Sequence, residues 1–405
     1  MRTRVAIVVA AVCAAFLVPV PAAADRPSGL GRILLTSTAE PATSQFVSWS
    51  RTEPRTGQRV VTVAPDGTVR TTAAKRKLGT TKRTAGSNHA RYVAKVTGLR
   101  PSTTYRYRIV SGGDATVWRT FRTAGRARDS FTFLQFGDTQ VRNAKVPARI
   151  IDRATRRHRG ARLVLQAGDV VDRPWSGREW ADLHRAINPS GQYRSWISSI
   201  GNHEQCVGAG SCRSGNARGF RSYFHAPSNG HPGQRRTWYF ADHGPARIIV
   251  LDTYGKDLAR QRDFLVKALR TNQRPWSIVL MHRGPFAARD DRSNAEVRRW
   301  FLKPLERHGA DLVLSGHDHS YARARKAGVT YLTSVSGPKY YDTSAQDFRD
   351  NGAIRRRAAY RTSTYQAVTV TPRALRVRAF VGHRANGAKP SARVGDVLDS
   401  FTLRR

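Results

Sequence analysis

Two kinds of hydrophobic pattern divide the chain. Between residues 30 and 124, short runs of alternating or β-branched residues are separated by turn signals, such as Pro-Asp-Gly at 65–67. Short strands at this spacing predict a small all-β sandwich. The expected strands are 32–36, 45–50, 59–64 and 92–96. A basic segment, 75–77 with 82–83, is expected to form a solvated hairpin loop, with a polyanion contact as the alternative.

After residue 130 the apolar runs are continuous instead of alternating. They fall at 131–136, 163–165, 247–251, 277–281 and 311–314, with basic amphipathic segments at 150–158, 257–270 and 293–308. Buried strands that alternate with helices indicate an α/β domain with helices covering its sheets. We therefore expect an N-terminal all-β sandwich over 30–124, an α/β catalytic domain over 131–383 and a C-terminal segment over 384–405.

The N-terminus has the order of a secretory leader. Arg2 and Arg4 precede an apolar run over 5–20, and small residues follow at 22–24. This order predicts a signal peptide, residues 1–24, cleaved after Ala24, and hence a secreted or extracellular protein. The run is shorter than the roughly 20 residues of a spanning helix, and no other stretch approaches that length. No transmembrane segment is therefore expected in the mature chain, and an uncleaved anchor is the alternative.

Two cysteines remain after cleavage. Cys206 and Cys212 lie in a glycine-rich stretch, and an oxidising compartment favours their pairing. We expect a disulfide, with two free thiols as the alternative.

The composition is unusual in its large excess of basic residues. The 405 residues include 70 Lys+Arg against 28 Asp+Glu, a formal charge of +42, and removal of the leader lowers it to +40. Only 11 of the basic residues are lysine. A hydrophobic content of 40% excludes a mostly disordered chain. Such a basic surface attracts polyanions such as nucleic acid, anionic lipid or wall polymer, without showing that any of them is the substrate.

Polar motifs directly follow most of the predicted buried strands. They are Gly-Asp at 137–138, Gly-Asp-Val-Val-Asp-Arg at 168–173, Gly-Asn-His-Glu at 201–204, His282, and Gly-His-Asp-His at 316–319. The carboxyl ends of parallel strands converge on one crevice, so these side chains are expected to meet there. The glycines in front of them allow the sharp turns that this requires.

The donor types suit a metal centre. Two aspartates, one asparagine and three histidines make a mixed nitrogen and oxygen set, which fits borderline or hard metal ions and not soft thiolate chemistry. One carboxylate can bridge two ions about 3.5–4 Å apart, which clamp an attacking hydroxide and a phosphoryl oxygen. Each motif is weak alone, and the five in this order make coincidence improbable.

The series GD, GDxxD, GNHE, VxxH and GHxH, from Gly137 to His319, resembles the calcineurin-like metallophosphoesterase superfamily. The purple acid phosphatases are the nearer relatives, because the last motif reads GHxHxYxR over 316–323 and that family carries an N-terminal fibronectin-like module. Residues 96–108 resemble the GLxPxTxYxYR segment of fibronectin type III modules, in which Tyr105 would form the tyrosine corner. The resemblance implies a catalytic domain of two packed β-sheets flanked by helices.

The resemblance also implies the role of each site residue. One metal would be held by Asp138, Asp169 and His319. The second would be held by Asp169, Asn202, His282 and His317, with Asp169 bridging the two. His203 would face the phosphate and protonate the leaving group.

Three positions depart from the family pattern. Many superfamily members have a histidine where this chain has Gln140, whose amide oxygen is a candidate weak ligand. The iron-binding tyrosine of purple acid phosphatases is replaced by Asp172. Plant-type members carry a histidine pair where Asp291 and Arg292 stand here, which leaves the phosphate contacts open.

A second resemblance assigns roles to two of these residues. Residues 168–173 and 201–204 also resemble the GDxVDR and GNHE motifs of serine/threonine protein phosphatases. In that match, Asp172 would pair with His203 and Arg173 would bind a phosphate oxygen. The alternatives are that Asp172 binds a metal directly and that Arg173 is a plain surface residue.

The expected function is that of a secreted, dinuclear metallophosphoesterase, an acid-phosphatase-like enzyme acting on phosphomonoesters. The two ions would be Fe, Zn or Mn, and the partner would be a phosphate-ester substrate, with polyanions contacting the basic surface. One alternative is a phosphodiesterase acting on nucleotides, lipid headgroups or wall polymers. The other is a polyanion-binding surface protein with an inactive metal site.

Overall fold

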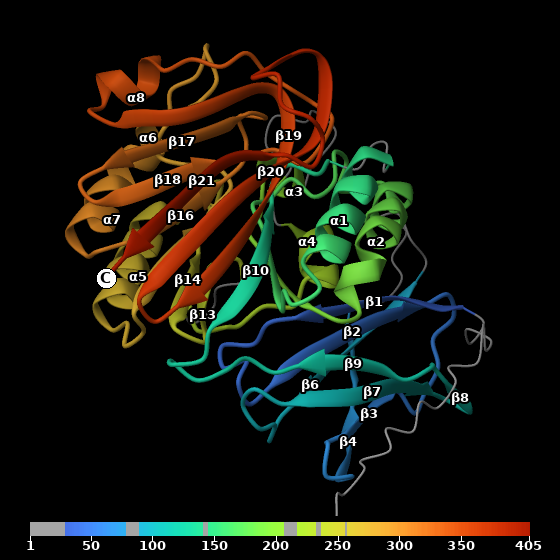
Figure 1. Cartoon of the computed structure of the whole chain (residues 1–405). Coiled ribbons are helices and arrows are strands. Elements are labelled where there is room, and N and C mark those ends of the chain that lie inside the picture. Colours follow the sequence, from blue (N-terminus) through green and yellow to red (C-terminus); the bar gives the residue numbers. More distant parts are fainter. Residues whose placement is uncertain (1–28, 78–88, 141–144, 206–216, 232–235, 256) are drawn as a thin grey trace, which may run out of the picture.

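A computed structural model describes residues 29–77, 89–140, 145–205, 217–231, 236–255 and 257–405 (Figure 1). The predicted leader, the two cysteines of the predicted disulfide, and residues 82–83 of the basic segment lie outside these residues. Lys75–Lys77, the first part of that segment, forms a short strand, β5.

The N-terminal module is a two-layered β-sandwich. One layer has the order β1-β2-β6-β5, and the other consists of β3, β4, β7, β8 and β9. Their bounds are β1 Leu30–Thr36, β2 Gln45–Arg51, β3 Arg59–Val63, β4 Val69–Ala73, β6 Ala90–Val96, β7 Thr104–Ser111, β8 Asp114–Ala115 and β9 Arg119–Arg122. Alternate residues of both layers fill the core, where Trp49 stacks on Tyr92.

Tyr105 makes the contact that gives a tyrosine corner its name. Its hydroxyl accepts a hydrogen bond of 2.9 Å from the backbone N–H of Arg100, five residues upstream. The bond ties the start of β7 to the turn before it.

The α/β part contains two sheets that share one long strand. The strand bounds are β10 Phe131–Phe136, β11 Leu163–Gln166, β12 Ser195–Ser198, β13 Tyr239–His243, β14 Ala246–Val250, β15 Trp276–Leu280, β16 Leu312–Ser315, β17 Tyr321–Lys326, β18 Val329–Thr333, β19 Ile354–Thr371, β20 Ala374–Lys389 and β21 Val397–Arg404. The first sheet runs β12-β11-β10-β19-β20-β21 and the second runs β13-β14-β15-β16-β18-β17-β19. The first third of β19 pairs with β17 and its last third with β10, so this strand passes from one sheet to the other.

Three hydrophobic clusters define four layers. The helices are α1 Lys145–Arg157, α2 Gly177–Gly191, α3 Asn202–Gln205, α4 Arg218–Tyr223, α5 Leu258–Arg270, α6 Ala295–Val297, the π-helical turn η1 Arg298–Leu302, α7 Lys303–Arg307 and α8 Gln346–Asp350. A central cluster joins inward residues of both sheets, such as Leu165 and Ile278. A second lies between the first sheet and α1 and α2, and a third between the second sheet and α5, η1 and α7. The prediction of an all-β sandwich followed by two packed sheets flanked by helices is confirmed.

The two parts of the chain are joined by strand pairing as well as by the linker. Strand β1 of the sandwich pairs in parallel with β12, with Thr36 opposite Trp196, so one sandwich layer extends the first sheet. The predicted boundary after residue 383 falls inside β20, and β21 pairs with β20. Among the described residues, no helix is long and apolar enough to cross a bilayer.

Candidate metal centre

Six donor side chains come together where the carboxyl ends of both sheets meet. Asp138, Asp169 and Asn202 follow β10, β11 and β12, which are parallel neighbours in the first sheet. The three histidines follow β15 and β16, which are parallel neighbours in the second sheet. Thus every residue that the sequence suggested as a metal ligand reaches one crevice.

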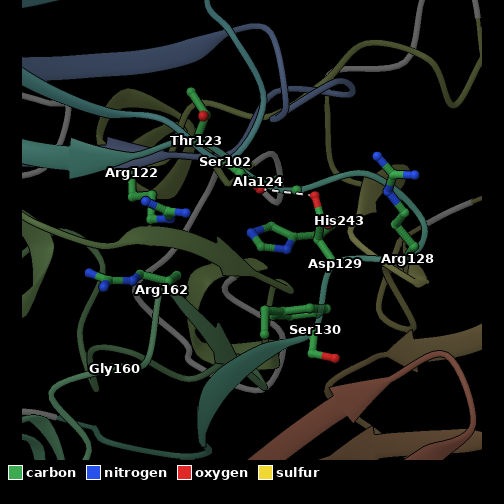
Figure 2. Close-up of a pocket in the computed structure, with 12 residues that line it drawn as sticks. Ser102, Arg122, Thr123, Ala124, Arg128, Asp129, Ser130, Gly160, Arg162 and His243 are labelled. Carbon is green, nitrogen blue, oxygen red and sulfur yellow. Dashed lines mark hydrogen bonds between the residues drawn. The ribbon is translucent and has the colours of Figure 1, made fainter. Parts of the chain in front are cut away.

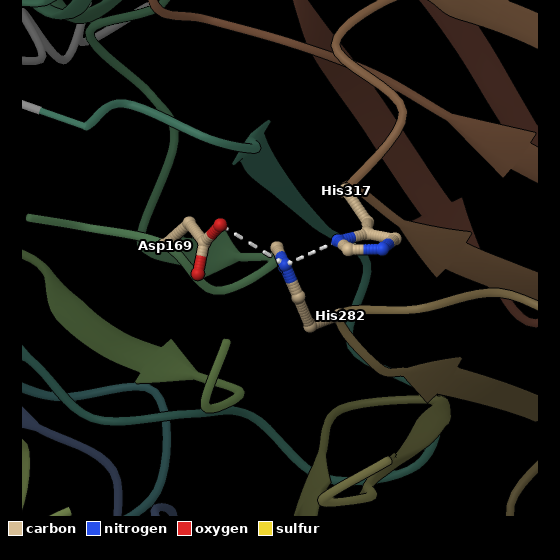
Figure 3. A group of neighbouring side chains, drawn as sticks. All are labelled: Asp169, His282 and His317. Atoms are coloured by element: carbon tan, nitrogen blue, oxygen red, sulfur yellow. Dashed lines mark hydrogen bonds and ion pairs between the residues drawn. The ribbon is translucent and has the colours of Figure 1, made fainter. Parts of the chain in front are cut away.

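The first group of donors surrounds one imidazole nitrogen. Nε2 of His282 lies 3.2 Å from Oδ2 of Asp169 and 3.2 Å from Nδ1 of His317 (Figure 3). The same nitrogen lies 3.1 Å from Oδ1 of Asn202. Nitrogen and oxygen donors that converge at such distances form the kind of mixed set that a borderline or hard metal ion binds.

The second group shares one carboxylate with the first. Ligand atoms of Asp138, Asp169 and His319 all lie within 4.8 Å of one another, as do those of Asp169, His282 and His317. Asp138 and Asp169 are buried, with 0% and 1% exposed. Because Asp169 belongs to both groups, its two oxygens are placed to serve two ions.

The far nitrogen of each imidazole is held by an oxygen. Nδ1 of His282 lies 2.7 Å from the carbonyl oxygen of Ala167, and Nδ1 of His319 lies 3.1 Å from that of Lys339. In His317 the hydroxyl of Tyr254 lies 2.8 Å from Nε2. Carbonyl oxygens only accept, so Nδ1 of His282 and of His319 donates and the other nitrogen of each ring keeps a lone pair for a metal. The hydroxyl of Tyr254 gives His317 the same arrangement when it accepts from Nε2.

Electrostatics also favour a cation here. Burial lowers the pKa of His317 well below its usual value and lowers that of His319 to about 3, so both rings are neutral donors. Burial also raises the pKa of Asp138. Burial alone would lower the pKa of His282, but the carboxylates of Asp169 and Asp138 outweigh burial and raise this pKa to about 10. The buried carboxylates thus attract a positive charge, which a metal ion supplies more completely than a proton.

Gln140 lies beside the shared carboxylate. Its Nε2 donates a hydrogen bond of 3.3 Å to Oδ2 of Asp169. Its Oε1 is buried and, within the described residues, has no hydrogen-bond partner. An unpartnered buried oxygen beside a carboxylate costs free energy unless a cation or water satisfies it. The amide is therefore placed to contribute an oxygen to an ion.

The backbone around the donors is strained and tightly packed. Asp138, Gln140, Asp169, His317 and His319 all have positive φ, between 34° and 73°. Strain of this kind persists where surrounding structure holds it, and it clusters at functional sites.

Two of the motif glycines are needed for space and not for positive φ. A Cβ on Gly201 would lie 1.9 Å from Oδ1 of Asp169, and one on Gly316 would lie 2.2 Å from Oδ2 of Asp138. Only glycine lets these backbone segments approach the carboxylates so closely.

Glu204 organises the loop of the shared aspartate, a role that the sequence did not reveal. Its carboxylate accepts hydrogen bonds of 2.9–3.2 Å from the backbone N–H groups of Asp169, Val170, Val171 and Gly201. Burial and the charge of Asp169 raise the pKa of Glu204 to about 7. The last residue of the Gly-Asn-His-Glu motif therefore fixes the loop that carries Asp169.

His203 lies at the edge of the centre and contacts Asp172 in two ways. Its ring Nδ1 lies 2.6 Å from the backbone carbonyl oxygen of Asp172 and 3.5 Å from the carboxylate Oδ1. Its Nε2 lies 3.8 Å from Oδ2 of Asp169, and the side chain is 21% exposed. The ring thus reaches both the metal donors and solvent.

Arg173 is bound to a helix and not to the donor cluster. Its Nε donates a hydrogen bond of 2.6 Å to Oε1 of the buried Glu179 on α2, and Glu179 also accepts from the backbone N–H groups of Asp172 and Arg173. The ion pair fixes the segment that carries Asp172.

Three further residues border the centre, and the sequence analysis gave none of them a role. The ring of Tyr341 packs edge-on against His319, 4.8 Å between centroids. Arg292 donates hydrogen bonds of 3.0 Å to the carbonyl oxygen of His317 and to Oδ1 of Asp318. Tyr254 could have been found, because it lies just past the carboxyl end of β14.

Comparisons with known proteins agree with this geometry. The sequence model of the calcineurin-like phosphoesterase family matches residues 131–321, and that of the purple acid phosphatase N-terminal domain matches residues 31–123. The chain therefore contains a calcineurin-like phosphoesterase domain and a purple acid phosphatase N-terminal domain. The matched ranges contain the sandwich and all six donors.

Individual relatives extend the comparison. An uncharacterized protein of Mycobacterium tuberculosis is 29% identical over 289 residues, 62% of this chain and 54% of that protein. The Fe(3+)-Zn(2+) purple acid phosphatase 12 of Arabidopsis thaliana is 27% identical over 190 residues, 43% of this chain and 39% of the relative. The chain thus spans about half the length of these curated relatives, or less.

A solved structure agrees with the fold. The purple acid phosphatase PPD1 of yellow lupin superposes with a TM-score of 0.77 at 16% identity, covering 93% of this chain and 75% of that one. At this identity the match supports the fold alone.

Proposed function

We propose that this chain is a secreted dinuclear metallophosphoesterase that hydrolyses phosphomonoesters. The observation that carries the proposal is the sharing of Asp169 by two groups of donors, one around Nε2 of His282 and one with Asp138 and His319. The order of charged, apolar and small residues over 1–24 supports secretion.

The residues present fit two metal ions. Asp138, Asp169 and His319 would hold one ion, with Gln140 as an added oxygen donor, and Asp169 with Asn202, His282 and His317 would hold the other. Fe, Zn and Mn all suit this donor set. The Arabidopsis relative is named as an Fe(3+)-Zn(2+) enzyme. Bound ions supply Lewis-acid activation of water and neutralise charge on the phosphoryl group.

The chain's own residues would act around that group. His203 is placed to give a proton to the leaving oxygen, because its Nε2 faces the donor cluster while Nδ1 is held by Asp172. Arg173 forms an ion pair with Glu179, and Arg292 forms one with Asp318. These ion pairs orient guanidinium groups that are candidates to bind phosphate oxygens.

The test is an activity screen with metal accounting. Purified protein is stripped with a chelator and reloaded with Fe, Zn or Mn, and hydrolysis of p-nitrophenyl phosphate is compared with that of bis-p-nitrophenyl phosphate. We expect about two ions per chain and a preference for the monoester. Full activity without metal would refute the dinuclear proposal, and a preference for the diester would establish the phosphodiesterase instead.

A matched pair of variants separates the metal centre from general charge effects. Asp169→Asn should lower activity by roughly a hundredfold or more, because it weakens the donor that both ions share. Asp182→Asn removes a carboxylate whose partner is Arg185, in an ion pair on α2, and should leave activity unchanged. Binding of polyanions with no turnover by the metal-loaded wild type would support the inactive, polyanion-binding alternative.

A further inference from the structure

A basic hollow lies between the sandwich and the α/β domain. It has a volume of about 530 Å³ and adjoins a second hollow of about 220 Å³, and Arg122 and Arg162 line both. In Figure 2 these two guanidinium groups lie together on one side of the hollow, with Arg128 on the other side and His243 between them. Because the two hollows share these two arginines, we treat them together and call them the linker groove.

Five arginines line the linker groove: Arg122, Arg128, Arg159, Arg162 and Arg194. Among the described residues, no carboxylate lies within 4.0 Å of their guanidinium nitrogens. The nearby acidic residue, Asp129, is already engaged by Ser102 Oγ at 3.0 Å and by the backbone N–H of Arg126 at 2.8 Å. Asp129 also lines the first hollow, where its charge interacts with that of Arg128, so the lining residues hold one carboxylate against five arginines and keep an excess of positive charge.

The guanidinium groups are close enough to repel one another. Burial and the charge of Arg122 lower the pKa of Arg162, and burial and the charge of Arg162 lower that of Arg194. An anion with several negative groups would relieve this repulsion.

A buried polar side chain also lacks a partner in the groove. His243 is 3% exposed, and its Nδ1 has no hydrogen-bond partner in the described part of the chain. The ring packs against Phe131, with 4.3 Å between centroids. Burial lowers the pKa of His243 to about 3, so the neutral ring can offer an N–H to an anion without adding charge.

The linker groove lies at the opposite edge of the sheet from the metal centre. Arg162 immediately precedes β11 and Arg194 immediately precedes β12, whereas Asp169 and Asn202 follow these strands. Seven residues separate Arg162 from Asp169, and an extended chain rises about 3.3 Å per residue, so the two sites are roughly 20 Å apart. The groove is thus a separate site, and it stands whether or not the proposed hydrolysis is correct.

We propose that the linker groove binds a linear oligophosphate anion. Several guanidinium groups that line the same groove match an anion that carries several phosphate groups. Single-stranded nucleic acid would also need aromatic side chains on which its bases can stack. Among the described lining residues, Tyr193 is the one aromatic residue with an exposed side chain.

The test measures binding of tripolyphosphate to the full chain by calorimetry. The groove variant is Arg122→Gln/Arg162→Gln. The control is Arg307→Gln/Arg356→Gln, which removes the same charge from exposed positions on α7 and β19 that line neither hollow. We expect at least about tenfold weaker binding in the groove variant alone, with p-nitrophenyl phosphate hydrolysis unchanged in both.

The comparison between proteins isolates the groove. Tripolyphosphate bound at the metal centre would contribute equally in all three proteins, so only a difference between them reports on the groove. Equal affinity in the groove variant, or an equal loss in the control, would overturn the proposal. Tighter binding of a short oligothymidylate that the groove variant loses would overturn it in favour of nucleic acid.

Discussion

The hydroxyl of Tyr254 lies 2.8 Å from Nε2 of His317, while Nδ1 of the same ring faces Nε2 of His282 at 3.2 Å. The phenol therefore holds the ring nitrogen that points away from the other donors. A partner on one imidazole nitrogen fixes the tautomer and leaves the other free to bind a metal. Tyr254 is in this sense a positioning residue for the second ion.

Removing this hydroxyl should weaken one ion more than the other. Tyr254→Phe keeps the ring packing against His317 and loses the hydrogen bond, so we expect about 10–100-fold weaker binding of one of the two metals. Titration of the stripped protein with Zn, followed by calorimetry, would measure this. Tyr341→Phe is the matched control, because its ring contacts His319 and its hydroxyl has no hydrogen bond among the described residues.

The same variant distinguishes positioning from ligation. If the phenol itself bound iron, the iron-loaded protein would show a visible charge-transfer band that Tyr254→Phe abolishes. We expect no such band in the wild type, because Asp172 stands where the family's iron-binding tyrosine would be.

Glu204 should matter for stability as much as for the site. In Glu204→Gln, one acceptor oxygen becomes an NH₂ group that faces backbone N–H donors, and two of the four hydrogen bonds are lost. Leaving buried donors unsatisfied costs about 1–3 kcal/mol each, so the free energy of unfolding should fall by about 2–6 kcal/mol. Denaturant unfolding at pH 8 measures the loss, and Glu40→Gln at an exposed position should be neutral.

Strand positions and donor types could be predicted from the sequence because they are local properties. The run at 131–136 coincides with β10, the run at 163–165 is one residue shorter than β11, and the run at 311–314 is shifted by one residue from β16. The placement of donors after these strands then follows from parallel pairing alone. For this reason the convergence of the candidate donors could be predicted from the sequence.

Contacts between distant segments could not be predicted in the same way. Nothing in the residues of β1 indicates that it pairs with β12, because edge strands of many sandwiches have the same pattern. Helix α2 was missed, although Ser176 caps it by accepting from the backbone N–H of Glu179. The four N–H donors of Glu204 come from two loops, which only the folded chain brings together.

Buried histidines should make stability depend on pH. The pKa of His243 falls from 6.5 to about 3 on folding, so below pH 6.5 the unfolded chain binds a proton that the folded chain does not. Stability therefore falls as pH decreases from 6.5 toward 3, by up to about 1.4 kcal/mol per pH unit for this group. His243→Phe keeps an aromatic ring against Phe131 and should flatten the curve by about 1 kcal/mol per pH unit between pH 6 and 4.

Urea unfolding of both proteins across this range provides the measurement for His243. The difference at pH 7.5 gives the effect of packing alone, which is subtracted from the acid values. Parallel curves for the two proteins would contradict neutral burial of the ring. His158 is expected to add to the slope in both proteins, because burial lowers its pKa to about 4.

The contact between His203 and Asp172 leads to the sharpest prediction about catalysis. The backbone carbonyl oxygen, at 2.6 Å from Nδ1, is the closer partner, and the carboxylate oxygen is 3.5 Å away. A carbonyl oxygen holds the orientation of the ring in any Asp172 variant that keeps the local fold. The carboxylate is the weaker of the two contacts and places a negative charge beside the ring nitrogen.

Substitutions of His203 and of Asp172 should therefore differ in how strongly they slow hydrolysis. His203→Ala should slow hydrolysis of an alkyl phosphate by roughly 10²-fold or more and slow p-nitrophenyl phosphate far less, because a nitrophenolate scarcely needs a proton to leave. Asp172→Asn should keep the orientation and cost roughly tenfold on the alkyl ester, because it removes only the weaker of the two contacts. Metal content should stay unchanged in both. Loss of one ion in Asp172→Asn, with both esters slowed equally, would instead make Asp172 a metal ligand.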